Sequence, residues 1–169
     1  NSGRVNANML MFRMLCSVND CDIRLYKIEG GNMRNAIPRD AEALFCMPQE
    51  HYSCIEKWLT KEAKAIKKEI SNVEPGFFAE VAPLRVAANT KVVTAKDTLN
   101  IINLMMVAPN GVQRMSQDMP GLVETSLNLA ITRTTGKAFT LKALLRSSVD
   151  SAKNTLGERL VCLAAMAGG

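Results

Sequence analysis

Histidine is almost absent from this chain, since His51 is the single one among 169 residues. Zinc sites and acid–base pairs mostly draw on several His, Cys, Asp or Glu side chains that converge on one place. The sequence also contains no GxSxG, HExxH, GxGxxG or P-loop motif. We therefore expect neither a catalytic residue nor a metal ligand among these residues, and we expect His51 to be a surface or boundary residue.

Cysteine is odd in number, without a CxxC pair, and three of the five cysteines lie in apolar helical patterns. That pattern is typical of reduced thiols and predicts a cytoplasmic rather than a secreted protein. No apolar run approaches the roughly 18 residues of a membrane span, and a signal peptide is not recognisable. The chain opens with "NSGRVNANMLMF" and not with Met, so we expect a cut inside a longer protein. The five cysteines of the chain are Cys16, Cys21, Cys46, Cys54 and Cys162.

Aromatic residues make up only 5% of the chain, and the formal charge of +5 is spread over 21 basic and 16 acidic residues. RNA-binding sheets stack bases on closely spaced aromatic side chains. Here Phe45, Phe77, Phe78 and Phe139 fall in separate segments. The charge excess is typical of a solvated surface rather than of a nucleic-acid face. The hydrophobic content of 47% is that of a globular protein.

Hydrophobic spacing in the first part of the chain predicts a helix over 4–17 and a strand over 22–29. After a Gly30–Gly31 turn, the pattern predicts a second strand within 36–47 and a long helix over 48–72. In the second part, we expect an extended segment over 76–88 and a helix over 94–107 that is capped by Thr94 with Asp97. A loop over 108–120, strands over 121–133 and 137–147, and a last helix to 166 that is capped by Ser147 with Asp150 complete the chain.

The predicted order is thus α-β-β-α followed by β-α-β-β-α. The second half, 74–169, reads as a complete βαββα unit, and the first, 1–73, reads as the same unit without its opening strand. Two such halves predict a single α+β domain over 1–169, a ferredoxin-like α/β sandwich with an antiparallel sheet and helices on one face. We expect the missing strand to precede Asn1.

Four polar residues stand where they could bind a ligand. Arg34 and Asn35 follow the two glycines, either as plain turn residues or as groups presented to a carboxylate or carbonyl oxygen. Asn128 lies on the less apolar face of a strand, which could also be an ordinary exposed face. Arg146 ends a strand just before a helix, where it could hold an anion or be a surface residue. Asn128 and Arg34 are the weaker candidates.

Five motifs carry a resemblance to a known family. In chain order they are "GRVNANML", "GGNMRNAIPRDA", "PNGVQRMS", "GLVETSLNLA" and "LLRSSVDSAK". Together, and nearly from end to end, they resemble the aminoacyl-histidine dipeptidases (Xaa-His dipeptidases, also called peptidase D). These enzymes belong to the aminoacylase/carboxypeptidase superfamily of di-zinc metallopeptidases. Five motifs in register are far more specific than any one of them alone.

The resemblance implies that this chain is the lid, or dimerisation, domain of such an enzyme. That domain is inserted into a catalytic domain, outside these residues, which holds two zinc ions through His, Asp and Glu ligands. The lid alone would then be inactive and bind no zinc. Its partners would be its own catalytic domain, a dipeptide substrate and, through the lid, a second copy. A family His-Ser-Gly motif, which sends a His to the active site, should lie several residues before Asn1.

The resemblance also implies roles for two residues. Lids of related enzymes supply an Asn and an Arg to the substrate, and Asn35, in an Asn-x-Ile-Pro motif, matches the first. Simpler members carry the Arg at the end of the following strand, where this chain reads "FCMP", but Arg146 stands at the equivalent place of the second half. Asn35 would then hold the scissile carbonyl or the substrate backbone. Arg146 would hold the C-terminal carboxylate.

Other interpretations stay open from the sequence. The chain could be a stand-alone ferredoxin-like binding module for RNA or a small effector, although the scattered aromatics disfavour RNA and no membrane partner is indicated. It could also be a structural dimerisation module, which is compatible with the lid. In that case an exposed strand edge such as "DIRLYKIE" (22–29) could pair across a two-fold axis.

Overall fold

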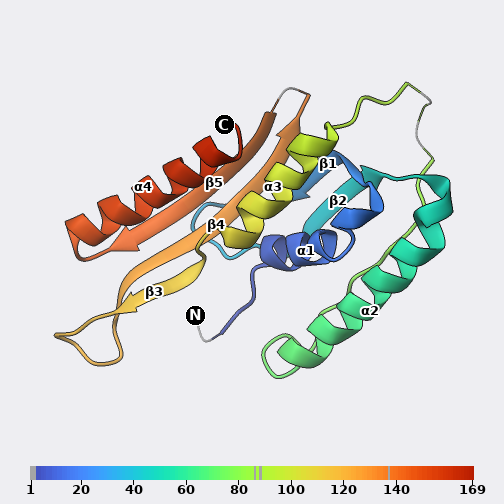
Figure 1. The fold of residues 1–169 in the computed structure, drawn as a ribbon. Coiled ribbons are helices and arrows are strands. Elements are labelled where there is room, and N and C mark those ends of the chain that lie inside the picture. Colours follow the sequence, from blue (N-terminus) through green and yellow to red (C-terminus); the bar gives the residue numbers. More distant parts are fainter. Residues whose placement is uncertain (1–2, 86, 88, 137) are drawn as a thin grey trace.

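The computed structural model describes residues 3–85, 87, 89–136 and 138–169, which form helices against one five-stranded antiparallel sheet (Figure 1). The predicted α+β class is therefore confirmed. Two short 3₁₀ turns, Asn19–Cys21 and Gln49–His51, precede β1 and α2. In chain order the elements are α1 Ala7–Cys16, β1 Arg24–Gly30, β2 Ala41–Cys46, α2 Tyr52–Ile70, α3 Ala95–Val107, β3 Gly111–Met115, β4 Val123–Thr135, β5 Ala138–Ser147 and α4 Asp150–Met166.

Strand β4 organises the sheet. One of its edges pairs with β5 along nearly its whole length, from Thr125 opposite Ser147 to Thr135 opposite Ala138. The other edge pairs with β3 over 123–127 and with β1 at 132–133. Strand β2 lies outside β1. Residues 128–131 of β4 therefore lie between two partner strands on that second edge, and their backbone groups need other partners.

A buried apolar cluster lies between the sheet and the helices. The rings of Phe12 on α1 and Phe139 on β5 meet edge to face, with centroids 6.0 Å apart and an interplanar angle of 78°. Such a contact adds to the burial of both rings. Helix α2 is tied to α1 by Arg13, which binds Glu62 at 2.8 Å and Glu69 at 2.7 Å. The buried cluster also includes Leu15, Leu25, Ile28, Ile55, Leu59, Ile102, Met105, Leu127, Leu129 and Leu156.

Most of the predicted elements are present within a few residues of their predicted bounds. The Oγ1 atom of Thr94 accepts a hydrogen bond of 3.1 Å from the backbone N–H of Asp97, as the predicted cap of α3 requires. The second strand of the first half begins at Ala41, because the residues before it belong to a loop that contains Pro38. The described residues contain no helix long and apolar enough to cross a membrane.

The second half departs from the prediction at three points. Residues 76–85 and 87 have no strand, whereas Val86 and Ala88, at the end of the predicted extended segment, lie outside the described residues. Phe78 is 76% exposed, so its apolar character does not reflect a buried strand. The predicted loop over 108–120 instead contains β3. Ser147 does not cap α4: Val149 is the N-cap residue, and Ser147 Oγ accepts a bond from its N–H at 3.0 Å.

The predicted free edge at 22–29 is also wrong. Strand β1 is covered by β2 on one side. Its other side pairs with β4 at Glu29 and Gly30 and is bonded elsewhere by side chains and by the chain before α3. The N–H of Leu25 binds Thr98 Oγ1 at 3.1 Å, and the N–H of Ile28 binds Thr134 Oγ1 at 2.8 Å. The carbonyl of Leu25 accepts from Val93 N at 2.7 Å. The outer edge on this side of the sheet belongs to β2.

Candidate functional site: the loop between β1 and β2

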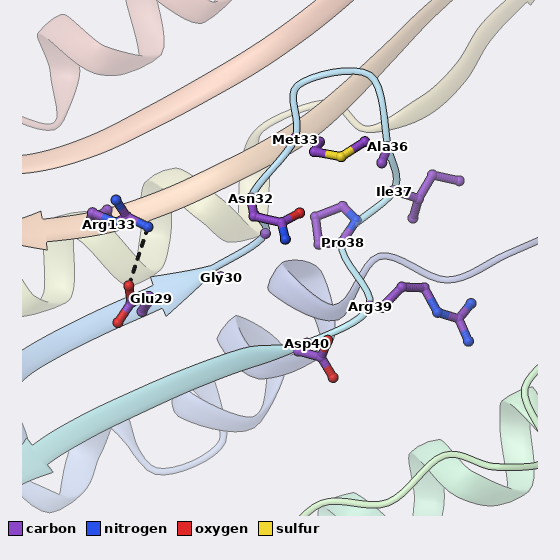
Figure 2. A pocket seen from close by; sticks show the side chains of 11 residues that line it. Glu29, Gly30, Asn32, Met33, Ala36, Ile37, Pro38, Arg39, Asp40 and Arg133 are labelled. Atoms are coloured by element: carbon purple, nitrogen blue, oxygen red, sulfur yellow. Dashed lines mark ion pairs between the residues drawn. The ribbon is translucent and has the colours of Figure 1, made fainter.

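The loop over 31–40 joins β1 to β2 and carries Arg34 and Asn35, both of them exposed. In Figure 2 this loop crosses in front of β4 while α1 lies behind the sheet, and Figure 1 shows the reverse view. The loop therefore lies on the face of the sheet opposite α1, which we call the open face. Its two ends are joined by a bond of 3.3 Å from Gly31 N to Asp40 O.

Gly30, the last residue of β1, and Gly31, the first residue of the loop, allow the backbone here to lie directly against its neighbours. A Cβ atom on Gly30 would stand 1.9 Å from Asn8 Oδ1. A Cβ atom on Gly31 would stand 1.9 Å from the carbonyl oxygen of Ala130, and Gly31 has a φ of +69° that favours glycine. The "GG" of the motif is thus required by close contact with α1 and β4.

Asparagine side chains supply the missing partners at the gap in the edge of β4. The N–H of Leu129 donates to Asn110 Oδ1 at 3.0 Å. The carbonyl oxygen of Leu129 accepts from Asn6 Nδ2 at 3.0 Å and from Asn8 Nδ2 at 3.2 Å. An Asn side chain offers the same donor and acceptor as a peptide group. These amides therefore replace a strand at this point.

Asn128 connects this cluster to the loop. Its Nδ2 donates to the carbonyl oxygen of Ala36 at 2.7 Å and, more weakly, to that of Arg34 at 3.4 Å. Its Oδ1 accepts from Asn6 Nδ2 at 3.3 Å. Asn35 thus stands between two residues whose carbonyl groups both accept from the partly buried side chain of Asn128. Sequence reasoning placed Asn128 beside a ligand, whereas the structure shows its amide bonded to the loop backbone.

Arg146 lies on the same open face. Leu127 and Leu145 are paired neighbours that pack in or against the core. Side chains alternate along strands, so the next pair, Ser126 opposite Arg146, points to the other side. Asn128 lies two residues beyond Ser126 on the same face of β4, so it is a diagonal neighbour of Arg146. A long side chain can span the separation between diagonal neighbours. The four predicted residues therefore share one face of the sheet.

A pocket of about 360 Å³ lies beside the loop (Figure 2). Glu29 and Arg133 line it and form an ion pair of 3.2 Å. Lys27 also binds Glu29 at 2.7 Å, and this hydrogen bond lowers the pKa of the Glu29 carboxyl from its ordinary value. Neither Arg34 nor Asn35 lines the pocket, so it is distinct from the part of the loop predicted to contact substrate.

The lone histidine has a structural contact. His51 is partly buried at the start of α2, and its Nδ1 lies 3.0 Å from the carbonyl oxygen of Cys21. This contact joins α2 to the connection before β1. Within the described parts of the chain, no three His, Cys, Asp or Glu side chains gather in a way that could hold a metal ion.

The sequence did not single out Asn6, Asn8 and Asn110 as parts of the site. Asn6 is 4% exposed and Asn8 is fully buried. Buried amides are rare unless hydrogen bonds satisfy their polar atoms, as they do here. All three stand in motifs that carried the family resemblance, "GRVNANML" and "PNGVQRMS". Asparagines repeated inside such motifs, where helix and strand patterns need none, were the signal that could have revealed them.

Residues 2–74 match the family model described as the peptidase dimerisation domain. Over 168 residues the chain is 33% identical to the cytosol non-specific dipeptidase of Escherichia coli (strain K12), covering 98% of this chain and 34% of that protein. The fold matches the crystal structure of aminoacylhistidine dipeptidase from Vibrio alginolyticus with a TM-score of 0.88 and 33% identity, over 99% of this chain and 34% of that one.

The chain thus spans about a third of the length of both relatives. The match to each relative runs almost from one end of this chain to the other, so it includes the loop, the asparagine cluster and Arg146. The family model covers α1, β1, β2 and α2. The chain therefore resembles, over nearly its whole length, about a third of each of these dipeptidases, and its own residues 2–74 match the peptidase dimerisation domain.

Proposed function

We propose that this chain is the lid domain of a zinc dipeptidase that hydrolyses Xaa-His dipeptides. The observation that carries the proposal is the end-to-end match, in sequence and in fold, to one third of two dipeptidases. One relative is called non-specific and the other acts on aminoacylhistidine, so the Xaa-His preference is the finer part of the proposal. The catalytic domain would lie outside these residues.

The open face would close over the active centre of that catalytic domain. Asn35 lies on the loop whose backbone is hydrogen-bonded to Asn128, and it would donate its side-chain N–H to the scissile carbonyl or the substrate backbone. Arg146 would bind the C-terminal carboxylate, for which a guanidinium is geometrically suited. Two zinc ions in the catalytic domain would supply Lewis acidity and a hydroxide nucleophile. Closure of the lid would exclude water and bring these groups together.

We also infer that the intact enzyme forms homodimers through this domain and works in the cytoplasm. The family model is named for dimerisation, and one relative is called cytosolic. Among the residues that the structure describes, strand β2 forms the outer edge on its side of the sheet, with Glu42 exposed and Leu44 partly buried. Sedimentation of the full-length protein, with and without a proline in β2, tests this inference, because Pro removes a donor that edge pairing needs.

The experiment that tests the function uses the full-length protein. We expect it to release free histidine from an Xaa-His dipeptide, to contain about two zinc ions per chain and to lose activity on removal of zinc by a chelator. The isolated 169-residue chain should neither hydrolyse the dipeptide nor bind zinc stoichiometrically. Hydrolysis by the isolated chain, or a full-length protein without dipeptidase activity, would contradict the proposal.

A further inference from the structure

We propose that Asn128 is a positioning residue that fixes the backbone on both sides of Asn35. This inference rests on the proposed contact between Asn35 and the substrate. The Nδ2 group of Asn128 has two N–H donors: one makes a short bond of 2.7 Å to the carbonyl oxygen of Ala36, and the other makes a long bond of 3.4 Å to that of Arg34, so Ala36 is the firmer of the two anchor points. Residue 35 lies between these two anchor points, so the amide determines where the Asn35 side chain begins.

The loop has little else to hold this part of its backbone. Within it, the N–H of Ala36 reaches Met33 O at 3.4 Å, which is a long bond. The other backbone bonds lie at the ends, from Gly31 to Asp40 and from Ala7 to Pro38 O at 3.1 Å. Exposed loops with few backbone hydrogen bonds open readily. The short bond of 2.7 Å from Asn128 to Ala36 is therefore the main restraint at the middle of the loop.

Asn128 is itself fixed from the interior. Its Oδ1 accepts from Asn6, whose Nδ2 also binds the Leu129 carbonyl and Asn110 Oδ1 at 3.3 Å. Asn6 caps α1 by accepting from Met9 N at 3.3 Å. A side chain with only 4% exposure thus joins the helix start, the edge of β4 and Asn128. These contacts connect the core to the loop through Asn6 and Asn128.

The chemistry requires an amide at position 128. An aspartate would keep the shape but would have no N–H to donate, and its charge would face two carbonyl oxygens. A leucine would fill the space and leave those oxygens without this partner. Catalytic contacts lose much of their effect when a group is displaced by about 1 Å. We therefore expect either substitution to reduce kcat/KM through Asn35 rather than through a contact of its own.

A double-mutant cycle in the full-length dipeptidase tests the inference. We expect Asn128→Leu to lower kcat/KM by about tenfold or more, and to lower it less than about twofold when Asn35 is already Ala, because residues that act as a unit are not additive. Thr134→Val is the matched control. It removes another β4 side chain that bonds a backbone group, Ile28 N, away from the loop. Its effect should be the same factor in both backgrounds.

A second measurement reads the loop directly. Hydrogen exchange at the N–H groups of Gly31 and Ala36, which bond Asp40 O and Met33 O within the loop, should be faster in Asn128→Leu than in wild type when it is measured in the full-length protein. Thr134→Val should leave it unchanged. Unchanged exchange in Asn128→Leu, or equal effects of Asn128→Leu in both Asn35 backgrounds, would overturn the inference. If Asn35→Ala has wild-type kinetics, the proposed role of Asn35 fails, while loop exchange still decides whether Asn128 holds the loop.

Discussion

The Oδ1 atom of Asn8 occupies the space in which a Cβ atom of residue 30 would stand, at a separation of 1.9 Å. That oxygen is not free to move away, because it accepts a hydrogen bond of 3.0 Å from Thr132 Oγ1 inside the fold. Asn8 and Thr132 are both fully buried. The backbone just before the loop therefore packs against the buried pair Asn8 and Thr132, with no room for a side chain at residue 30.

Gly30→Ala should destabilise the chain. The added methyl group must displace Asn8 or the backbone of β1, and such overpacking costs about 1–3 kcal/mol. We expect a free energy of unfolding lower by that amount in urea denaturation of the 169-residue chain. Gly76→Ala is the control, because a Cβ atom there meets nothing within 4 Å. Equal stabilities of the two variants would contradict the close packing of the loop.

Phe12→Ala tests the core that supports α1. Phe12 is fully buried and contacts Phe139 edge to face. Its removal should lower the free energy of unfolding by about 3–5 kcal/mol, through lost burial and the cavity left behind. Phe78→Ala, at a residue that is 76% exposed, should change stability by less than about 0.5 kcal/mol. A similar loss in both variants would contradict the assigned core.

The Glu29 carboxyl should titrate below the ordinary pKa of 4.5 for this group, chiefly because Lys27 donates a hydrogen bond to it. Its contribution to stability is therefore present above the unfolded-state pKa and is lost as the pH falls through the lower folded-state value. Carboxyl carbon chemical shifts measured against pH give this pKa directly. We expect Lys27→Met to raise it.

Arg133 also contacts Glu29, so the pKa in Lys27→Met should still lie somewhat below the ordinary value. Lys142→Met serves as the control, because Lys142 lies on β5 and is not among the groups that shift Glu29. A Glu29 pKa that does not change in Lys27→Met would show that the ion pair is not formed in solution.

Arg146→Ala should weaken recognition of the substrate's C-terminal carboxylate. In the full-length enzyme we expect kcat/KM for an Xaa-His dipeptide to fall about 10²-fold or more, as for loss of one transition-state contact. The C-terminally amidated dipeptide should be a poor substrate of wild type and should lose little more in the variant. Arg159→Ala, at an exposed position of α4, is the control. Equal losses for the acid and the amide would place Arg146 away from the carboxylate.

Local patterns were sufficient for elements whose side chains alternate strongly or carry a cap. Strand β4 was predicted because Leu127 and Leu129 alternate with polar residues, and α3 because Thr94 and Asp97 mark its start. Strand β3 escaped prediction because all its residues are exposed, so its sequence has no buried face to reveal. The extended segment predicted over 76–88 was wrong because Phe78 is apolar but exposed, so its apolar side chain does not mark a buried strand.

The candidate site was predictable in part. The turn residues Arg34 and Asn35 could be recognised from glycines and a family motif. The hydrogen bonds that hold the loop could not be predicted, because the bond from Asn128 to Ala36 spans 92 positions and the bond from Asn6 to Asn128 spans 122. Hydrogen bonds between distant polar side chains leave no periodic pattern. They become visible when the register of β4 with β1 and β3 leaves part of an edge unpaired.

The most direct test of this account compares two asparagines of the same loop in the full-length enzyme. Asn35 stands between the two residues whose carbonyl oxygens accept from Asn128, whereas Asn32 is exposed and lines the neighbouring pocket. The measurement is kcat/KM for an Xaa-His dipeptide. We expect a loss of about 10²-fold or more in Asn35→Ala and near wild-type activity in Asn32→Ala. Wild-type activity in Asn35→Ala would contradict this expectation.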